Sequence, residues 1–176
     1  MRKYMIDLET LGLRHDAVIL SIGAVRFDSD GPIPGEELYI ELDTSSHAHC
    51  SIAPDTVKFW IEETKKGNPP PMSGTCTPYY ACCQIIDFLS GLEKEDEIWV
   101  NGTDFDIPKL QYLFETAGLC VPWKYFQVRD LRTLRKIFPH IPSEVNPHKH
   151  NALSDARCQA QHAADILYHI EENKGE

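Results

Sequence analysis

Apolar segments follow one another differently in the first part of the chain and in the rest, and this difference limits the folds that are possible. Three strand-like segments come first, at 4–6, 18–27 and 38–42, and only short connections separate them. Strands joined by short connections pair antiparallel, because a parallel pair needs a crossover of about a dozen residues or more. The first part of the chain therefore predicts an antiparallel meander.

Helical and strand-like patterns alternate in the rest of the chain. Val57, Trp60 and Ile61 have helical spacing, and three consecutive prolines mark the loop behind them. The predicted helices are 54–64, 78–89, 108–117, 131–137 (behind a cap at Asp130) and 153–171, the strands are 98–100 and 126–128, and 65–72 and 139–150 are irregular. Strands that stand between helices are typical of parallel pairing. We therefore predict an α/β fold with a mixed five-stranded sheet, part meander and part parallel, flanked by helices.

Length and composition are those of a soluble protein with one domain. The 176 residues suit a single core, and no apolar run approaches the roughly 18 residues that a membrane span needs. The N-terminal apolar stretch is too short, and too soon interrupted by charge, for a signal peptide. A cytoplasmic protein is the default expectation.

The six cysteines form no C-x-x-C pair, which argues against a zinc ribbon or a thioredoxin-like motif. In a cytosolic chain they are expected to be reduced thiols. His47, His49 and Cys50 lie close together in the sequence and could bind a metal. A plain polar loop is the simpler interpretation, because no second cluster has the spacing of zinc ligands.

The formal net charge of −10 argues against a protein that coats nucleic acid through bulk electrostatics. Bound divalent cations would offset part of this charge where acidic residues gather. The best basic segment is 124–136, in which Arg132 shares a helix face with Arg135 and Lys136. This face is either simply solvated or in contact with phosphates. The charge therefore favours a substrate that is gripped at its end.

Acidic residues recur at three places where predicted elements begin or end. Asp7 and Glu9 follow the first strand, and residues two apart in an extended chain point to the same side. Asp106 lies just before a helix, and Asp155 lies in the first turn of the last helix, five residues after His150. Each has a structural alternative: a helix N-cap for Asp106, interaction with the helix dipole for Asp155, and a solvated loop histidine for His150.

Taken together, these residues indicate a metal site. Four carboxylates gathered at one edge of a sheet would repel one another unless cations lay between them. Oxygen ligands select hard ions such as Mg²⁺ or Mn²⁺. A pair of such ions is an arrangement that enzymes use to cleave phosphodiesters by in-line displacement.

The order of these motifs resembles the signature of the DEDDh exonucleases, a superfamily with an RNase H-like fold. The motifs are Asp7-x-Glu9, Phe105-Asp106 and His150-x4-Asp155. They run from the first strand to the last helix, so the resemblance implies a single 3′–5′ exonuclease domain over 1–176. The surrounding phrases are most similar to those of small phage and prophage exonucleases of the T-even exonuclease A type. These phrases are Ile6-Asp7-Leu8-Glu9-Thr10-Leu11-Gly12, Ser21-Ile22-Gly23-Ala24-Val25 and Val128-Arg129-Asp130.

The resemblance also implies a role for each residue. Asp7 would contact both divalent cations, and Asp106 would serve one of them. Glu9 and Asp155 would complete the other cation site. His150 would act as the general base that takes a proton from the attacking water.

Two of these assignments have competitors nearby in the sequence. Asp104 could take the place of Asp106, but the family pattern puts the acid directly after phenylalanine. His148 is an equally plain neighbour of His150. A sister group of the superfamily has a tyrosine where this chain has Asn151, which favours the histidine branch.

Five further residues are candidates for substrate contact. By resemblance, Thr10 and Leu11 would touch the terminal sugar and base. Phe105 would pack either against a base or in the core. Arg129 and Arg132 are the candidate phosphate contacts in the basic segment.

The resemblance thus implies a phosphodiester hydrolase that releases nucleoside 5′-monophosphates from single-stranded ends. The phage-like phrases favour DNA over RNA. Nucleic acid with a free 3′ end would be the partner, without a membrane, and a homodimer is one candidate assembly. A catalytically inactive binding module is an alternative, although no motif acid is missing. An RNase H-like endonuclease is another, which His150 disfavours.

Overall fold

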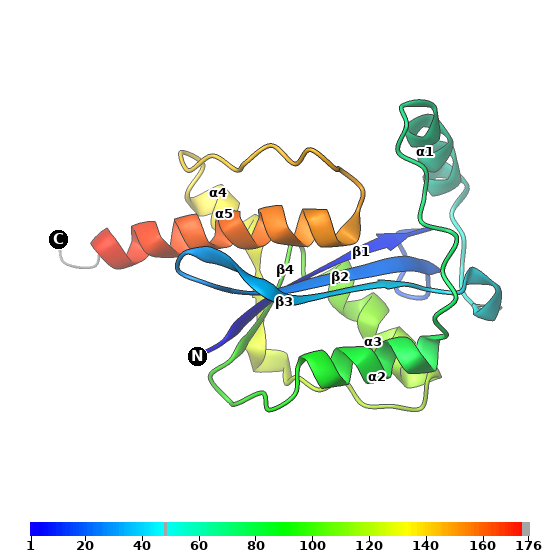
Figure 1. Ribbon diagram of the computed structural model, residues 1–176, viewed down its shortest axis with the longest axis horizontal. Coiled ribbons are helices and arrows are strands. Elements are labelled where there is room, and N and C mark those ends of the chain that lie inside the picture. The colour runs from blue at the N-terminus through cyan, green and yellow to red at the C-terminus, as the bar shows by residue number, and fades with distance from the viewer. Residues whose placement is uncertain (48, 174–176) are drawn as a thin grey trace.

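The computed structural model describes residues 1–47 and 49–173, and it shows one mixed sheet with helices on both faces (Figure 1). The strands are β1 (Lys3–Thr10), β2 (Ile19–Asp28), β3 (Gly31–Glu41), β4 (Glu97–Val100) and β5 (Val128–Asp130). Their order in the sheet is β3-β2-β1-β4-β5. β2 pairs antiparallel with β1 and β3, whereas β4 pairs parallel with β1 and β5. The predicted meander with added parallel strands is confirmed.

Several strands have different limits from those predicted. β1 continues through Asp7 and Glu9 instead of ending before them, because every residue of β1 faces a partner in β2. β3 begins at Gly31, well before the predicted start, and the φ of +108° at this glycine closes the tight turn from β2. The predicted strand 126–128 begins only at Val128, because a 3-10 helix occupies the residues before it.

The helices agree with the predicted ones to within two residues at each end. Among the described residues they are α1 (Pro54–Lys65), α2 (Pro78–Phe88), α3 (Asp106–Thr116), α4 (Leu131–Ile137) and α5 (Ala152–Glu172), with 3-10 helices at Thr44–Ser46 and Tyr125–Gln127. Asp130 caps α4 as predicted, because its Oδ1 accepts a hydrogen bond of 2.7 Å from the backbone N–H of Thr133. None of the described helices is long and apolar enough to cross a membrane.

Side chains that alternate along β1 divide the interior into two cores. Tyr4 and Ile6 belong to the core that includes residues of α2 and α3, whereas Met5 packs in the core under α5. Figure 1 shows these layers, with α5 on one side of the sheet and α2 and α3 on the other. α5 lies close to the sheet because its inner face is built from fully buried alanines: Ala152, Ala156, Ala160, Ala163 and Ala164. By the same alternation, Asp7 and Glu9 lie on the α5 side.

α1 stands apart from the layers, at one end of the sheet (Figure 1). Its main anchor is Trp60, which is 3% exposed and packs with Leu11, Val18 and Leu20. The indole Nε1 donates a hydrogen bond of 3.0 Å to the backbone oxygen of Thr10. α1 is therefore tied directly to the end of β1, next to the motif acids.

Candidate active site

Three of the predicted acids converge where β1 meets the start of α5. The carboxylate oxygens of Asp7, Glu9 and Asp155 lie within 4.8 Å of one another. Asp7 and Glu9 project from the same face of β1, and Asp155 faces them from the first turn of α5. Residues that are distant in sequence thus form one cluster.

The close approach of α5 to the sheet depends on Gly23. This residue pairs with Asp7 across the β1–β2 ladder. A Cβ at this position would lie 2.2 Å from the carbonyl carbon of Ala152, at the first residue of α5. Only a glycine leaves room for this backbone, so Gly23 lets α5 bring Asp155 down to β1.

The loop before α5 is organised around Asp155. One of its carboxylate oxygens accepts a hydrogen bond of 2.9 Å from Nδ2 of Asn146, and the other accepts one of 2.9 Å from the backbone N–H of His150. His150 has a φ of +64°, in the left-handed region that residues other than glycine seldom adopt. The N-cap of α5 is Asn151, whose side chain accepts from the N–H of Ser154. Asp155 therefore does more than interact with the helix dipole, because it also holds the loop.

Asp106 is the first residue of α3, and the N-cap position is occupied by Phe105. The N-cap alternative for Asp106 is therefore wrong, and no side-chain cap hydrogen bond is formed at this end. Asp106 is only 2% exposed, whereas the side chain of Asp104 is 84% exposed and lies 3.8 Å from Arg132. The structure thus places Asp106 in the interior and Asp104 in solvent.

Burial and mutual repulsion make the ionised cluster unfavourable without a cation. Burial raises the pKa of Asp7 well above its ordinary value, and the charges of Asp106 and Glu9 raise it further. Burial, followed by the charges of Asp155 and Asp106, raises the pKa of Glu9 from 4.5 to about 8. Burial also raises the pKa of Asp106 to about 7, although a backbone hydrogen bond from Gly102 lowers it. A set of carboxylate oxygens in this condition suits hard divalent cations.

Gln159 is the polar partner of the central acid. Its Nε2 donates a hydrogen bond of 2.7 Å to Oδ1 of Asp7, and this bond partly offsets the raised pKa of that carboxyl. Gln159 is 8% exposed and lies one turn after Asp155 on α5. In the sequence, Gln159 and His162 are polar residues on the Asp155 side of the last helix, which either support the site or simply make that helix face polar.

The His150 side chain lies on the aromatic edge of the site. Its ring packs edge-on against Phe59 and Trp60, with centroid separations of 5.0 and 6.0 Å. Its Nε2 lies 3.7 Å from a carboxylate oxygen of Glu63 on α1. This contact between α1 and the loop before α5 could not be predicted from the spacing of residues.

Two cavities flank the cluster, and His150 borders both. One, of about 390 Å³, is mainly apolar and includes Glu9, Thr10, Leu13 and Phe105 in its lining. The other, of about 380 Å³, is polar and is lined by residues that include Asn101, Arg135, Asn146, Asp155 and Gln159. The carboxylates therefore lie between an apolar and a polar recess.

The remaining predicted contacts divide between these cavities and other places. Thr10 and Phe105 line the apolar cavity. Leu11 is 8% exposed and packs with Trp60. Arg129 is paired with Glu97, with Nε 2.9 Å from Oε1.

Arg135 is a basic residue that lines the polar cavity beside the cluster. Its Nε donates to Nδ1 of His162 at 3.0 Å, and its Nη1 donates to Oδ1 of Asn101 at 2.9 Å. Arg132 remains more exposed, near Asp104. Segment composition identified the basic helix, and packing against α5 brings Arg135 to the polar cavity.

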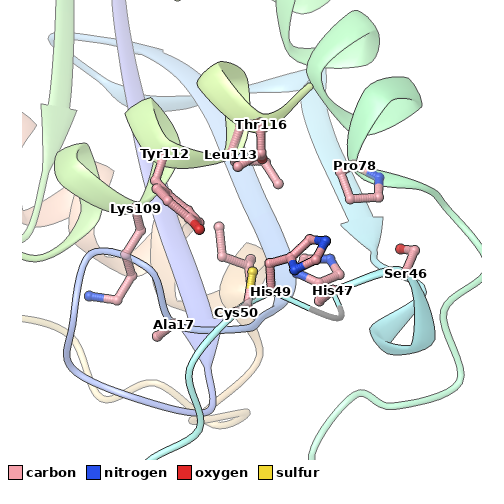
Figure 2. A pocket seen from close by; sticks show the side chains of 11 residues that line it. Ala17, Ser46, His47, His49, Cys50, Pro78, Lys109, Tyr112, Leu113 and Thr116 are labelled. Atoms are coloured by element: carbon pink, nitrogen blue, oxygen red, sulfur yellow. The ribbon is translucent and has the colours of Figure 1, made fainter. Parts of the chain in front are cut away.

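His47, His49 and Cys50 line a small separate pocket of about 60 Å³ (Figure 2). Among the described residues, the side chains whose ligand atoms lie close enough to share a metal ion are those of Asp7, Glu9 and Asp155. The stem of Lys109 and the ring of Tyr112 line the same pocket from α3.

Comparison with known proteins identifies the family. A family model described as the 3′-5′ exoribonuclease Rv2179c-like domain matches residues 2–167. The chain belongs to this family. The match to the Rv2179c-like domain extends from β1 into α5 and so includes every motif acid. Membership confirms the expected enzyme class, a 3′–5′ exonuclease. No curated protein matches the sequence.

Solved exonuclease structures share the fold of this Rv2179c-like domain. A structure of exonuclease I is 15% identical with a TM-score of 0.66, and the match covers 99% of this chain and 41% of that one. E. coli exonuclease I in complex with a 5cy-dA13 oligonucleotide is 14% identical with a TM-score of 0.67, and the match covers 99% and 41%. The nuclease domain of 3′hExo, a DEDDh family member bound to rAMP, is 12% identical with a TM-score of 0.65, over 98% and 92%.

These likenesses confirm the predicted RNase H-like sheet. The Rv2179c-like chain spans about two fifths of the exonuclease I chains that it matches. At this level of identity the likeness shows a shared fold, and a shared fold does not determine the chemistry of the site.

Proposed function

We propose that the chain is a metal-dependent 3′–5′ exoribonuclease that releases nucleoside 5′-monophosphates from the end of single-stranded RNA. The observation that carries the proposal is the convergence of Asp7, Glu9 and Asp155, with buried Asp106 coupled to them electrostatically. The description of the Rv2179c-like family supports RNA as the substrate. The two cavities beside the carboxylates supply room for a chain end.

The residues of the site would have separate roles in binding the cations and the substrate. Asp7, Glu9 and Asp155 would hold one Mg²⁺ or Mn²⁺ ion, and Asp7 with Asp106 would hold a second. When bound, such a pair of ions activates water and stabilises the departing 3′ oxygen. The apolar cavity suits the terminal base, and the polar cavity with Arg135 suits the phosphates.

His150 would accept the proton of the attacking water. Its loop position at the border of both cavities gives its ring access to the space next to Glu9 and Asp155. The carboxylate of Glu63, 3.7 Å from Nε2, would stabilise the protonated ring. Phe59 and Trp60 limit where this ring can move.

Single-stranded DNA is the second candidate substrate. The phage-like phrases around Asp7 and Gly23 favour it, and a similar structure of exonuclease I holds a 5cy-dA13 oligonucleotide. RNA and DNA differ at the 2′-hydroxyl, which a site can bind or exclude. The family description is the reason for preferring RNA.

The test uses 5′-labelled RNA and DNA strands of the same sequence, incubated with the protein and Mn²⁺. We expect a ladder that shortens from the 3′ end, and faster shortening of RNA. Internal cuts alone, or no cleavage of either strand, would contradict an exonuclease. Faster shortening of DNA would agree with the proposed active site but would make DNA the preferred substrate.

Three further expectations stay predictions. A closer kinship with T-even phage exonucleases, a cytoplasmic location and a homodimeric assembly are each compatible with the fold. The inactive binding module stays an alternative, and the cleavage assay above decides it.

The metal-free protein should lose stability as pH rises. Because the pKa of Glu9 is about 8 in the fold against an ordinary value of 4.5, the folded state holds its proton more tightly than the unfolded state. This contribution is complete below pH 4.5 and is lost by about pH 8. For a chain of this size, about 1 kcal/mol moves the unfolding midpoint by roughly 2–4 °C. In chelator we therefore expect a fall of several degrees over this range, measured by thermal unfolding.

Adding Mn²⁺ should raise the midpoint at pH 8 and flatten this pH dependence, because cations stabilise the ionised carboxylates. Glu9→Gln is the matched variant, since it removes the titrating group while keeping its shape. Its midpoint in chelator should vary less with pH than that of the wild type. A wild-type midpoint that rises with pH in chelator would contradict the cluster.

Replacing His150 by Gln should lower the turnover rate by about 10²–10³-fold, because general-base catalysis contributes on this order. The matched control is His148→Gln two residues earlier, in the same loop, where the side chain is exposed. This control should remain within about threefold of wild type, in line with the small effect of most surface substitutions. The measurement is nucleotide release under saturating RNA. Equal losses in the two variants would remove His150 from the catalytic role.

A further inference from the structure

Lys109 is a buried cation that the proposed reaction does not use. It lies on α3, one turn after Asp106, and is 1% exposed. Its Nζ donates hydrogen bonds of 3.0 Å to the backbone oxygens of Leu13 and Phe105. Its hydrogen-bond partners are thus two neutral carbonyls, and the charges of Asp106 and Asp104 partly offset the lowering of its pKa by burial. Burying an ammonium group is costly, so its contacts have to be strong and well directed to hold it there.

The ammonium group also lies against an aromatic ring. Nζ is 3.3 Å from the centre of the Phe105 ring, which is a cation–π contact. Lys109 therefore holds Phe105 twice, by its carbonyl and by its ring. Figure 2 shows the Lys109 side chain leaving α3 beside Tyr112, with its nitrogen directed away from the small pocket.

The two segments that Lys109 joins form walls of the apolar cavity. Leu13 belongs to the loop after β1, and Phe105 directly precedes α3. Both side chains line the cavity that also contains Glu9 and Thr10. Leu13 is 76% exposed and so has little packing of its own to hold it there. The ammonium group is the polar link between these walls.

We propose that Lys109 is a positioning residue that holds Leu13 and Phe105 in place to receive the base of the 3′-terminal nucleotide. The inference rests on the proposed function, because it assigns the apolar cavity to that nucleotide. Lys109 itself touches no base. It acts through the two apolar side chains whose backbone it ties, and apolar and aromatic surfaces are what a base stacks on.

The test is an equilibrium measurement on Lys109→Met, which keeps the length of the side chain and removes the charge. Binding of AMP, which has a base, is compared with binding of ribose 5-phosphate, which has none, by calorimetry in Mn²⁺. We expect AMP to bind about tenfold more weakly to the variant than to wild type, the loss typical of one charged hydrogen-bonding group. Ribose 5-phosphate should bind equally to both proteins.

Equal weakening of both ligands would overturn the proposal, since Lys109 would then act through Asp106 or the fold as a whole. Unchanged AMP binding would overturn it too, as would a wild type that binds neither ligand. Failure of the proposed function is recognised separately, because it would appear as intact nucleic acid in the cleavage assay while ligand binding is still measured.

Leu13→Ala keeps the proposal testable if Lys109→Met does not fold. The exposed Leu13 is not needed for the core, so this variant should fold, bind AMP more weakly and leave ribose 5-phosphate unchanged. If both variants fold, their combination should weaken AMP binding by less than the product of the single effects, because both act through the same wall. Lys94→Met, at an exposed site, should match wild type. Normal AMP binding by Leu13→Ala would contradict the role of this wall.

Discussion

Replacing Asp7 by Asn should lower nucleotide release by at least about 10⁴-fold, because it removes the one carboxylate expected to contact both cations. Asp7 is central to the cluster, since its oxygen lies within 4.8 Å of those of Glu9 and Asp155 and its pKa responds to Asp106. An amide of the same shape keeps the volume of the side chain but withdraws its charge. The measurement is the single-turnover rate on labelled RNA with Mn²⁺.

The same variant should be more stable than wild type when chelator is present, because one of the repelling charges has gone. Mn²⁺ should then raise its unfolding midpoint less than it raises that of wild type. Asp28→Asn, at an exposed position at the far end of β2, is the control and should keep normal activity. Retention of activity within tenfold in Asp7→Asn would falsify the metal-site assignment.

The second large effect distinguishes two acids that are two residues apart. Asp106→Asn should lower the rate by about 10³-fold or more, whereas Asp104→Asn should change it by less than about threefold. Asp106 is 2% exposed and coupled to the cluster, but the side chain of Asp104 is 84% exposed. The two substitutions are chemically identical and close in sequence, so each is a control for the other.

Both variants should remain folded at the assay temperature in Mn²⁺, which separates a catalytic loss from unfolding. Because burial raises the pKa of Asp106 to about 7, its replacement by Asn should also weaken the pH dependence of stability in chelator. A larger loss of activity in Asp104→Asn than in Asp106→Asn would reverse the assignment.

Local patterns predicted much of the fold because they depend on neighbours in the sequence. The apolar run 18–27 and the helical spacing of Val57, Trp60 and Ile61 correspond to β2 and α1. Asp130 caps α4 as its position suggested. The end of β1 was harder to predict, because Asp7 and Glu9 are polar and are kept extended only by pairing with β2.

The candidate site shows the same division. The motif residues, their order and their positions at β1, α3 and α5 could be predicted without the structure, because a side chain's chemistry and its place in an element are local properties. Long-range packing determines which neighbours share the site. It buries Asp106 and exposes Asp104, sets His150 against Glu63 and the aromatic edge of α1, and brings Arg135 to the polar cavity beside the cluster.

The surroundings of Lys109 also depend on long-range packing. In the sequence it is one lysine in a predicted helix, with nothing to relate it to Leu13, 96 residues earlier. Packing of α3 against the loop after β1 buries the ammonium group. Burial strengthens its interactions with the two carbonyl oxygens and with the Phe105 ring. The acids could be predicted from local sequence patterns, whereas long-range packing determines which residues surround them.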